Sequence, residues 1–314
     1  MTDGARAFLL HAGFLAVLAG LGLVLPEYHH GVMARVMVLA VYATGYNLAF
    51  GYTGLLSLGH AMFFAAGMYG LALPMQLAGL GLVPAFAVAI LAGAGLAAVA
   101  GLLALRTTGV AFMIVTLMFA QAGYLAILLA GRWTRGDEGF TIPGALRRIG
   151  GLDLTSAADR YATALALFGA VLLGTLWLVR SPLGRTFVAV RENEERARLL
   201  GYDTTRTKLL AVILSGTVSA AGGAAYAALF GYAGAGFASV QYSILPLLWV
   251  LLGGAGTVIG PFLGTLFMTY LIDWASGLTS AYMLIAGAAL ILLTLFAPGG
   301  IAGEIRRRIW KGLP

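Results

Sequence analysis

Apolar runs long enough to cross a lipid bilayer recur along the whole chain. Each is apolar on all sides, whereas the strands of a membrane barrel alternate apolar and polar residues. About 20 apolar residues in a helix cover the hydrocarbon core of a bilayer. The pattern predicts an all-α, polytopic membrane protein with about ten transmembrane helices in one domain, residues 1–314. The expected spans are residues 8–25, 36–50, 55–73, 82–103, 110–131, 161–179, 209–230, 244–254, 258–272 and 282–297.

Two of these runs, 244–254 and 258–272, are short for a full span. They are either two broken helices or one re-entrant unit, because irregular backbone at membrane depth is tolerated where protein or a cavity covers it. Glycine makes up 45 of 314 residues, and small residues let membrane helices approach closely. The glycines expected to pack in this way are Gly93, Gly95, Gly101, Gly222 and Gly223.

Composition agrees with a membrane protein. Only 10% of the residues are charged, against about 25% in soluble domains. The net charge of +7 is explained by basic residues beside membrane helices rather than by nucleic-acid binding. There is no cysteine, so disulfides and thiol chemistry are excluded.

The basic residues also predict orientation, because Lys and Arg are enriched in cytoplasmic loops. With a cytoplasmic N-terminus, ten spans place both termini inside, residues 132–160 in an outside loop and residues 180–208 inside. Thirteen of the nineteen basic residues are then inside: Arg6, Arg106, Arg306, Arg307, Arg308, Lys311 and seven within residues 180–208.

Residues 180–208, here called the charged segment, interrupt the apolar pattern. They hold eleven charged side chains, seven basic and four acidic, whereas residues 209–303 hold only Asp273. Ser181 and Pro182 are a typical helix start, and Gly201 is a typical stop. A helix between them would carry the pairs Glu192–Arg196 and Glu194–Arg198 and one face of Leu183, Phe187, Val190, Glu194 and Ala197. Asp203 or Thr204 would cap the next helix. The charged segment therefore predicts a compact amphipathic helical element at the cytoplasmic surface.

This element binds either a protein partner or lipid headgroups. A polar face of mixed sign favours a protein partner, because charge patterns confer specificity there, whereas lipid-binding helices are rich in Lys and Arg.

The charged segment and three other stretches carry a family resemblance. Glu195-Arg196-Ala197-x-x-x-Gly201 resembles the EAA motif of binding-protein-dependent ABC importer permeases, with Arg196 where that motif has Ala. Four stretches are similar to the LivM type of the branched-chain amino-acid permease family: SPLGRTFVAVRENEERARLLGYDTTRTKLLAVILS, NLAFGYTGLLSLGHAMFFAAGMYG, LRTTGVAFMIVTL and LLGGAGTVIGPFLGTL. The resemblance covers nearly the whole chain, in order.

The resemblance implies a permease subunit of the bacterial inner membrane that imports amino acids or a related small solute. Its partners would be two ATP-binding subunits of LivF and LivG type, a second permease of LivH type and a periplasmic solute-binding protein, in a lipid bilayer. The charged segment would seat in the ATP-binding subunits through Arg191, Glu192, Asn193, Glu194, Glu195, Ala197, Leu200 and Gly201. Neither lysine, Lys208 or Lys311, lies in a P-loop motif, so ATP would be hydrolysed on another chain and this one would need no cofactor.

Two stretches predict breaks along a translocation path. Gly51–Ala61 mixes glycine and polar residues, and Ser57 and His60 would share a helix face. In Gly253–Pro261 the glycines allow tight turns and the proline removes a donor. The candidate path residues are Asn47, Ser57, His60, Thr116, Gln121, Gly253, Gly254 and Gly256. Asn47 and His60 either contact solute or form interhelical hydrogen bonds.

The outside loop has charged residues, Arg135, Asp137 and Glu138, that either dock the binding protein or are merely solvated. An ion-coupled secondary transporter is the alternative function, but such proteins carry acids or lysines at midplane. An intramembrane enzyme would need a nucleophile–base pair or metal ligands, and His11, His29, His30 and His60 form no such set.

Overall fold

The computed structural model describes residues 3–297 and 299–309 of the chain. Lys311, one of the predicted cytoplasmic residues, lies outside them. The helices in chain order are α1 (Asp3–Val24), α2 (Glu27–Asn47), the π-helix η1 (Leu48–Tyr52), α3 (His60–Ala78), α4 (Leu82–Ala104), α5 (Gly109–Leu129), α6 (Gly131–Thr134), the 3-10 turn η2 (Gly144–Leu146), α7 (Ala157–Arg180), α8 (Pro182–Glu192), α9 (Glu194–Leu199), α10 (Thr204–Phe230), the 3-10 turn η3 (Ala235–Ala238), α11 (Val240–Gly253), α12 (Gly260–Leu278), α13 (Tyr282–Phe296) and α14 (Gly300–Ile309).

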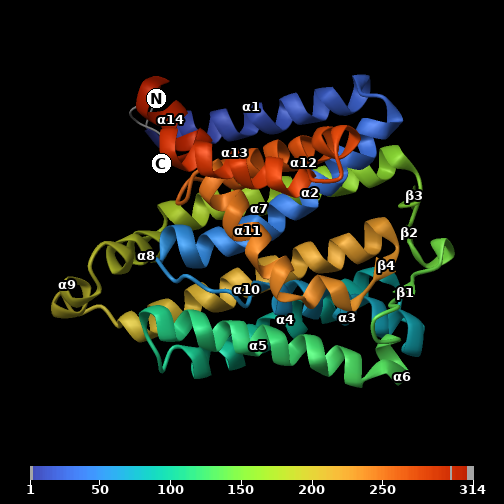
Figure 1. Cartoon of the computed structure of the whole chain (residues 1–314), viewed down its shortest axis with the longest axis horizontal. Helices are drawn as coiled ribbons and strands as arrows, with labels where there is room; N and C mark the ends of the chain where they lie inside the picture. The colour runs from blue at the N-terminus through green and yellow to red at the C-terminus, as the bar shows by residue number, and fades with distance from the viewer. Residues whose placement is uncertain (1–2, 298, 310–314) are drawn as a thin grey trace.

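Figure 1 shows the long helices running between two ends of the molecule. Helices α8, α9 and α14 lie at one end, here called the α9 end. The opposite end, here called the β-strand end, carries short strands. Strand β1 (Phe140–Thr141) pairs antiparallel with β4 (Tyr232–Ala233), and β2 (Arg148–Ile149) with β3 (Leu152–Asp153).

Seven helices of the described chain are long and apolar enough to cross a membrane: α1, α2, α3, α4, α5, α7 and α10. The remaining three predicted spans correspond to α11, α12 and α13, which pack in the same bundle. The short pair consists of two separate helices that are joined by a loop and packed against each other, which agrees with the predicted interruption. The predicted all-α, polytopic membrane fold is confirmed.

Helix α2 forms the centre of the core. Its residues from Val36 to Asn47 are all buried, because α7, α10 and α12 surround it. The helices at the periphery bury only a narrow stripe; on α5 the buried residues are Phe112, Thr116 and Ala120. A helix that is apolar all round but mostly unburied by protein presents its surface to lipid.

Glycines set the close approach of α10 to its neighbours. A Cβ on Gly223 would overlap the carbonyl oxygen of Phe64 in α3, and one on Gly93 would overlap the Ala220 side chain. Cβ atoms on Gly101 and Gly222 would also be crowded. These four packing glycines are confirmed. The prediction for Gly95 was wrong, because that glycine has nothing within 4 Å of its Cβ position.

Candidate functional site: the charged segment and two helix breaks

The charged segment forms two short helices, α8 and α9, at the α9 end. The predicted caps are present: the Ser181 hydroxyl accepts from the Gly184 amide, and the Asp203 side chain accepts from the Arg206 amide. Gly201 has a left-handed φ of 91°, which favours glycine.

The prediction of a single helix up to Gly201 was wrong. Asn193 is extended, with φ −161° and ψ 102°, and its side chain caps α9 by accepting from the Arg196 amide. An Asn side chain bonds its own neighbouring backbone and thereby competes with helix continuation. Glu192 and Arg196 therefore lie on different helices, and their predicted pairing along one helix is lost.

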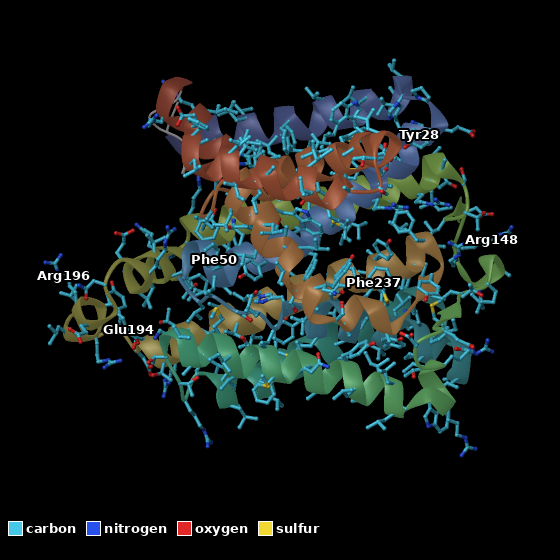
Figure 2. The ribbon with its side chains drawn as sticks, in the orientation of Figure 1. Tyr28, Phe50, Arg148, Glu194, Arg196 and Phe237 are labelled. Carbon is cyan, nitrogen blue, oxygen red and sulfur yellow. The ribbon has the colours of Figure 1, made fainter. Side chains whose placement is uncertain are left out.

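One face of the charged segment packs on the membrane helices and the other is free. Phe187, Val190 and Ala197, which were predicted to share one face, are all buried. A contact between the buried Ala197 and an ATP-binding subunit stays a prediction. Leu199 and Leu200 are 89% and 72% exposed, and Arg191, Glu192, Glu195 and Gly201 are exposed as well. Figure 2 places Arg196 at this end and Arg148 at the opposite one.

An ion-pair network fixes α9 to the start of α10. Glu194 forms an ion pair with Lys208. It also forms the predicted ion pair with Arg198, at 3.3 Å. Burial raises the pKa of the Glu194 carboxyl, but the Lys208 hydrogen bond and charge, with smaller help from Thr204 and Arg198, outweigh it and hold the pKa below its ordinary value. Glu194 is therefore ionised at neutral pH.

The first helix break lies where it was predicted, after Gly51. Residues 53–59 are non-helical between η1 and α3. Side chains satisfy part of this backbone: Thr116 Oγ1 accepts from the Leu58 amide at 3.2 Å, and Ser243 Oγ accepts from the Ala61 amide at 3.0 Å. Ser57 lies in the non-helical stretch and His60 begins α3, so the prediction that they share a helix face was wrong.

His60 links three helices. Its Nε2 lies 2.7 Å from Ser215 Oγ in α10, and that hydroxyl donates to the Gly45 carbonyl in α2 at 2.6 Å. Since the hydroxyl has one proton, Nε2–H is the donor of the first bond. His60 is only 2% exposed. The described contacts are interhelical hydrogen bonds, and contact with a solute stays a prediction, as it does for Thr116 (buried) and Gln121 (half-buried) on α5.

The second break, residues 254–259 between α11 and α12, lies against the first. Gly253 leaves room for the carbonyl of Gly260, and Gly254 and Gly256 have φ values of 117° and 74°. Asn47 holds this loop with both ends of its amide: Nδ2 donates to the Thr257 carbonyl and Oδ1 accepts from the Gly256 amide, each at 2.9 Å.

Arg191 joins the charged segment to both breaks. Its Nη1 donates to the Gly51 carbonyl at the end of η1. A Cβ on Gly256 would lie 2.8 Å from the same Nη1 and 3.0 Å from the Gly51 oxygen, so only glycine allows this approach. We call this group the Arg191 junction: Arg191, Gly51, Asn47, Gly256 and Thr257. If α8 moved, the Arg191 side chain would transmit the displacement to both helix breaks.

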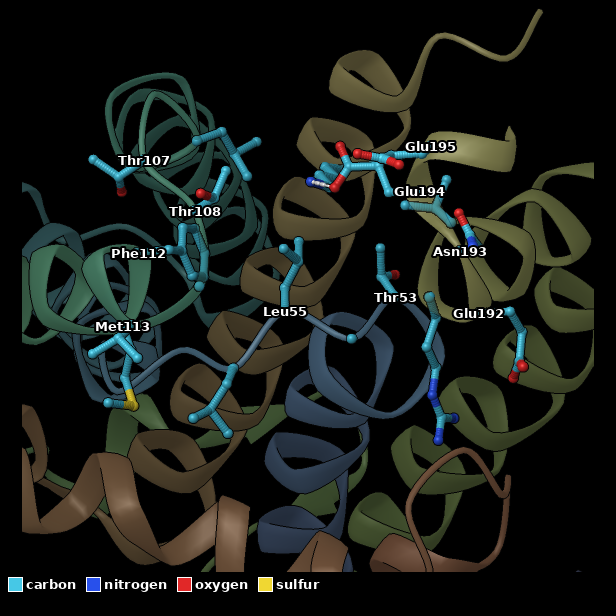
Figure 3. Close-up of a pocket in the computed structure, with 18 residues that line it drawn as sticks. Thr53, Leu55, Thr107, Thr108, Phe112, Met113, Glu192, Asn193, Glu194 and Glu195 are labelled. Atoms are coloured by element: carbon cyan, nitrogen blue, oxygen red, sulfur yellow. Dashed lines mark hydrogen bonds and ion pairs between the residues drawn. The ribbon is translucent and has the colours of Figure 1, made fainter. Parts of the chain in front are cut away.

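A cavity of about 710 Å³ opens beside the junction at the α9 end. Figure 3 shows Glu192, Asn193, Glu194 and Glu195 on one side and Thr107, Thr108 and Phe112 on the other, with Thr53 and Leu55 between them. None of the predicted path residues lines this cavity, whereas five predicted coupling residues do: Arg191, Glu192, Asn193, Glu194 and Glu195.

At the β-strand end, Arg135, Asp137 and Glu138 are exposed. Strand β1 and the Tyr232 hydroxyl, which donates to the Glu138 carbonyl at 3.0 Å, tie this loop to the region after α10. The three side chains are accessible to a partner, and docking stays a prediction.

Sequence reasoning missed Ser215, Ser243 and Thr257. The sequence does contain a pattern that could have identified Ser215. Ser215 and Ser219 lie four residues apart in an apolar run and so share a helix face. Thr257 had no such pattern, because its role depends on a residue 210 positions away.

The fold and the site define a polytopic helical membrane protein in which an exposed charged segment contacts two interrupted helices, as expected of a transport permease. A family model described as "Branched-chain amino acid transport system / permease component" matches residues 28–295. The chain belongs to this family. It is accordingly a permease component of an ABC transport system for small solutes, in the inner membrane.

Individual relatives agree. The high-affinity branched-chain amino acid transport system permease protein LivM of Salmonella typhimurium is 29% identical over 300 residues, 88% of this chain and 71% of that protein. LivM of Escherichia coli is 29% identical over 295 residues, 87% and 69% of the two chains. The autoinducer 2 import system permease protein LsrC of Enterobacter sp. is 32% identical over 152 residues, 47% of this chain and 42% of its own. No solved structure matches the chain.

Proposed function

We propose that this permease imports branched-chain or other hydrophobic amino acids, driven by ATP hydrolysis on separate subunits. The α9 end is cytoplasmic, and the charged segment seats in two ATP-binding subunits of LivF and LivG type. A second permease of LivH type completes the membrane part. A periplasmic binding protein delivers the solute at the β-strand end and contacts Arg135, Asp137 and Glu138.

The observation that carries this proposal is the Arg191 junction. The exposed residues of α8 and α9 are accessible to a partner, and Arg191, which is one of them, extends its guanidinium to both helix breaks. A displacement of the charged segment by its partner is thus transmitted directly to Gly51 and Gly256. Family membership supports the same division between a permease and its ATPase.

The chain should be purified from its native membrane in mild detergent and every co-purifying protein identified by mass spectrometry. Two ATP-binding subunits and a second permease of similar size are expected. A chain that purifies without them, and still transports after reconstitution without them, would contradict the proposal and favour a secondary transporter.

A further inference from the structure

Three arginines gather around Phe230, the last residue of α10, at the β-strand end. The Cζ atoms of Arg35 in α2 and Arg160 in α7 each lie 5.5 Å from the centre of the Phe230 ring. Arg147 donates to the carbonyl of the preceding residue, Leu229, at 3.2 Å. Arg35 is exposed and the other two are half-buried, so solvent reaches the cluster.

Backbone and ring contacts hold the cluster in place of acidic partners. Arg160 donates to the carbonyls of Leu154, at 3.4 Å, and Thr155, at 3.1 Å. Among the residues that the structure describes, no carboxylate forms an ion pair with Arg35, Arg147 or Arg160, and Arg147 Nε is buried without a partner.

Arg35, Arg147 and Arg160 lack acidic partners although an arginine next to them has one. The neighbouring Arg148 pairs with Asp153 at 3.0 Å, so the same loop does supply a carboxylate, but to a different arginine. Arg147 has a structural role at the C-terminal carbonyls of α10, where cations are favourable. Arg35 and Arg160 do not contact these carbonyls, and the charge of Arg160 is repelled by those of Arg147 and Arg35.

An aromatic surface adjoins the arginines. The Tyr226 ring lies 4.7 Å from that of Phe230 and 4.9 Å from that of Phe237, measured between ring centres. Guanidinium groups bind carboxylates through paired, charge-assisted hydrogen bonds, and aromatic rings favour apolar groups. The arginines could therefore bind the carboxylate of an organic acid, and the adjoining aromatic rings could contact its apolar tail.

We propose that Arg35, Arg147 and Arg160 form a receptor for the carboxylate of an entering solute. The inference rests on the proposed function and adds a binding site to it: the entering solute is recognised through its carboxylate, which a neutral solute lacks. The receptor lies at the end remote from the charged segment, so the solute would meet it before it reaches the helix breaks.

The test uses two probes with the same apolar tail, 4-methylpentanoate, which ends in a carboxylate, and 4-methylpentanamide, which ends in a neutral amide. Saturation-transfer NMR measures their binding to the purified permease complex in lipid nanodiscs, without any binding protein. The acid should bind, more weakly as salt is added, and the amide should not. Arg35→Gln should weaken acid binding at least about ten-fold, since a charged hydrogen bond is lost. Arg148→Gln, a change at the neighbouring paired arginine, should leave it unaltered.

Equal binding of acid and amide, no binding of the acid, or unchanged acid binding by both Arg35→Gln and Arg160→Gln would overturn the proposal. Because the binding protein is absent, its own carboxylates cannot be the source of an Arg35 effect. The assay needs no ATP, so it gives an answer whatever the co-purification shows. If the complex does not bind the acid but still carries out ATP-driven uptake, the receptor is rejected and the proposed function stands.

Discussion

Removing the Arg191 side chain should separate the charged segment from the two helix breaks. Arg191→Ala deletes the hydrogen bond to the Gly51 carbonyl and the packing against Gly256. A hydrogen bond to a charged group contributes about 1.5–3 kcal/mol, and because Arg191 is exposed the lower end applies. A loss of about 1.5 kcal/mol shifts the equilibrium between linked and separated states about ten-fold.

The assay is the ratio of solute transported to ATP hydrolysed by the reconstituted complex with its binding protein. Arg191→Ala should lower this ratio by about ten-fold while complex assembly is unchanged. Arg185→Ala is the matched control, because Arg185 is an exposed arginine on the same helix and is not the arginine that bonds to Gly51 and approaches Gly256. An unchanged ratio for Arg191→Ala, or an equal fall for Arg185→Ala, would refute the transmission through the junction.

Three further outcomes follow from the same contacts. Glu195→Lys and Gly201→Asp should each leave ATPase activity uncoupled from transport in a folded complex, because both lie on the exposed face and Gly201 has a left-handed φ; normal coupling in both would count against docking there. Gly223→Ala should destabilise the protein by about 2 kcal/mol in thermal unfolding, because its Cβ would overlap a carbonyl of α3, whereas Gly95→Ala should not. The lowered pKa of Glu194 gives stability that is present above the unfolded value of about 4.3 and is lost as the pH falls through the folded value. The hydrogen-exchange protection of α9, taken relative to the intrinsic exchange rate at each pH, should therefore fall in acid, and Glu194→Gln should remove this dependence.

Hydropathy predicted the membrane fold because a bilayer demands the same apolar composition whatever the tertiary contacts. Cap chemistry at Ser181, Asp203 and Gly201 was likewise local and correctly predicted. The break at Asn193 was missed because the buried positions on either side of it, Val190 and Ala197, keep the spacing of one continuous helix.

The Arg191 junction could not be predicted as an assembly. Each member carried some local signal, since Arg191 was a coupling candidate and Asn47 and Gly256 were path candidates. Their meeting depends on chain separations of 140 and 209 residues, which no periodicity records. The cluster around Phe230 was not predicted, because no motif links Arg35 on α2 with Arg147 in the predicted outside loop and Arg160 on α7.

The central claim, that the charged segment seats in an ATP-binding subunit, is tested most directly by site-specific photocrosslinking. A photoreactive amino acid should replace Leu200, which is 72% exposed at the α9 end, and in a control chain Trp133, which is 52% exposed at the opposite end. After irradiation of intact membranes, the ATP-binding subunit should be captured from position 200 and not from position 133. No capture from position 200, or equal capture from both, would contradict the claim.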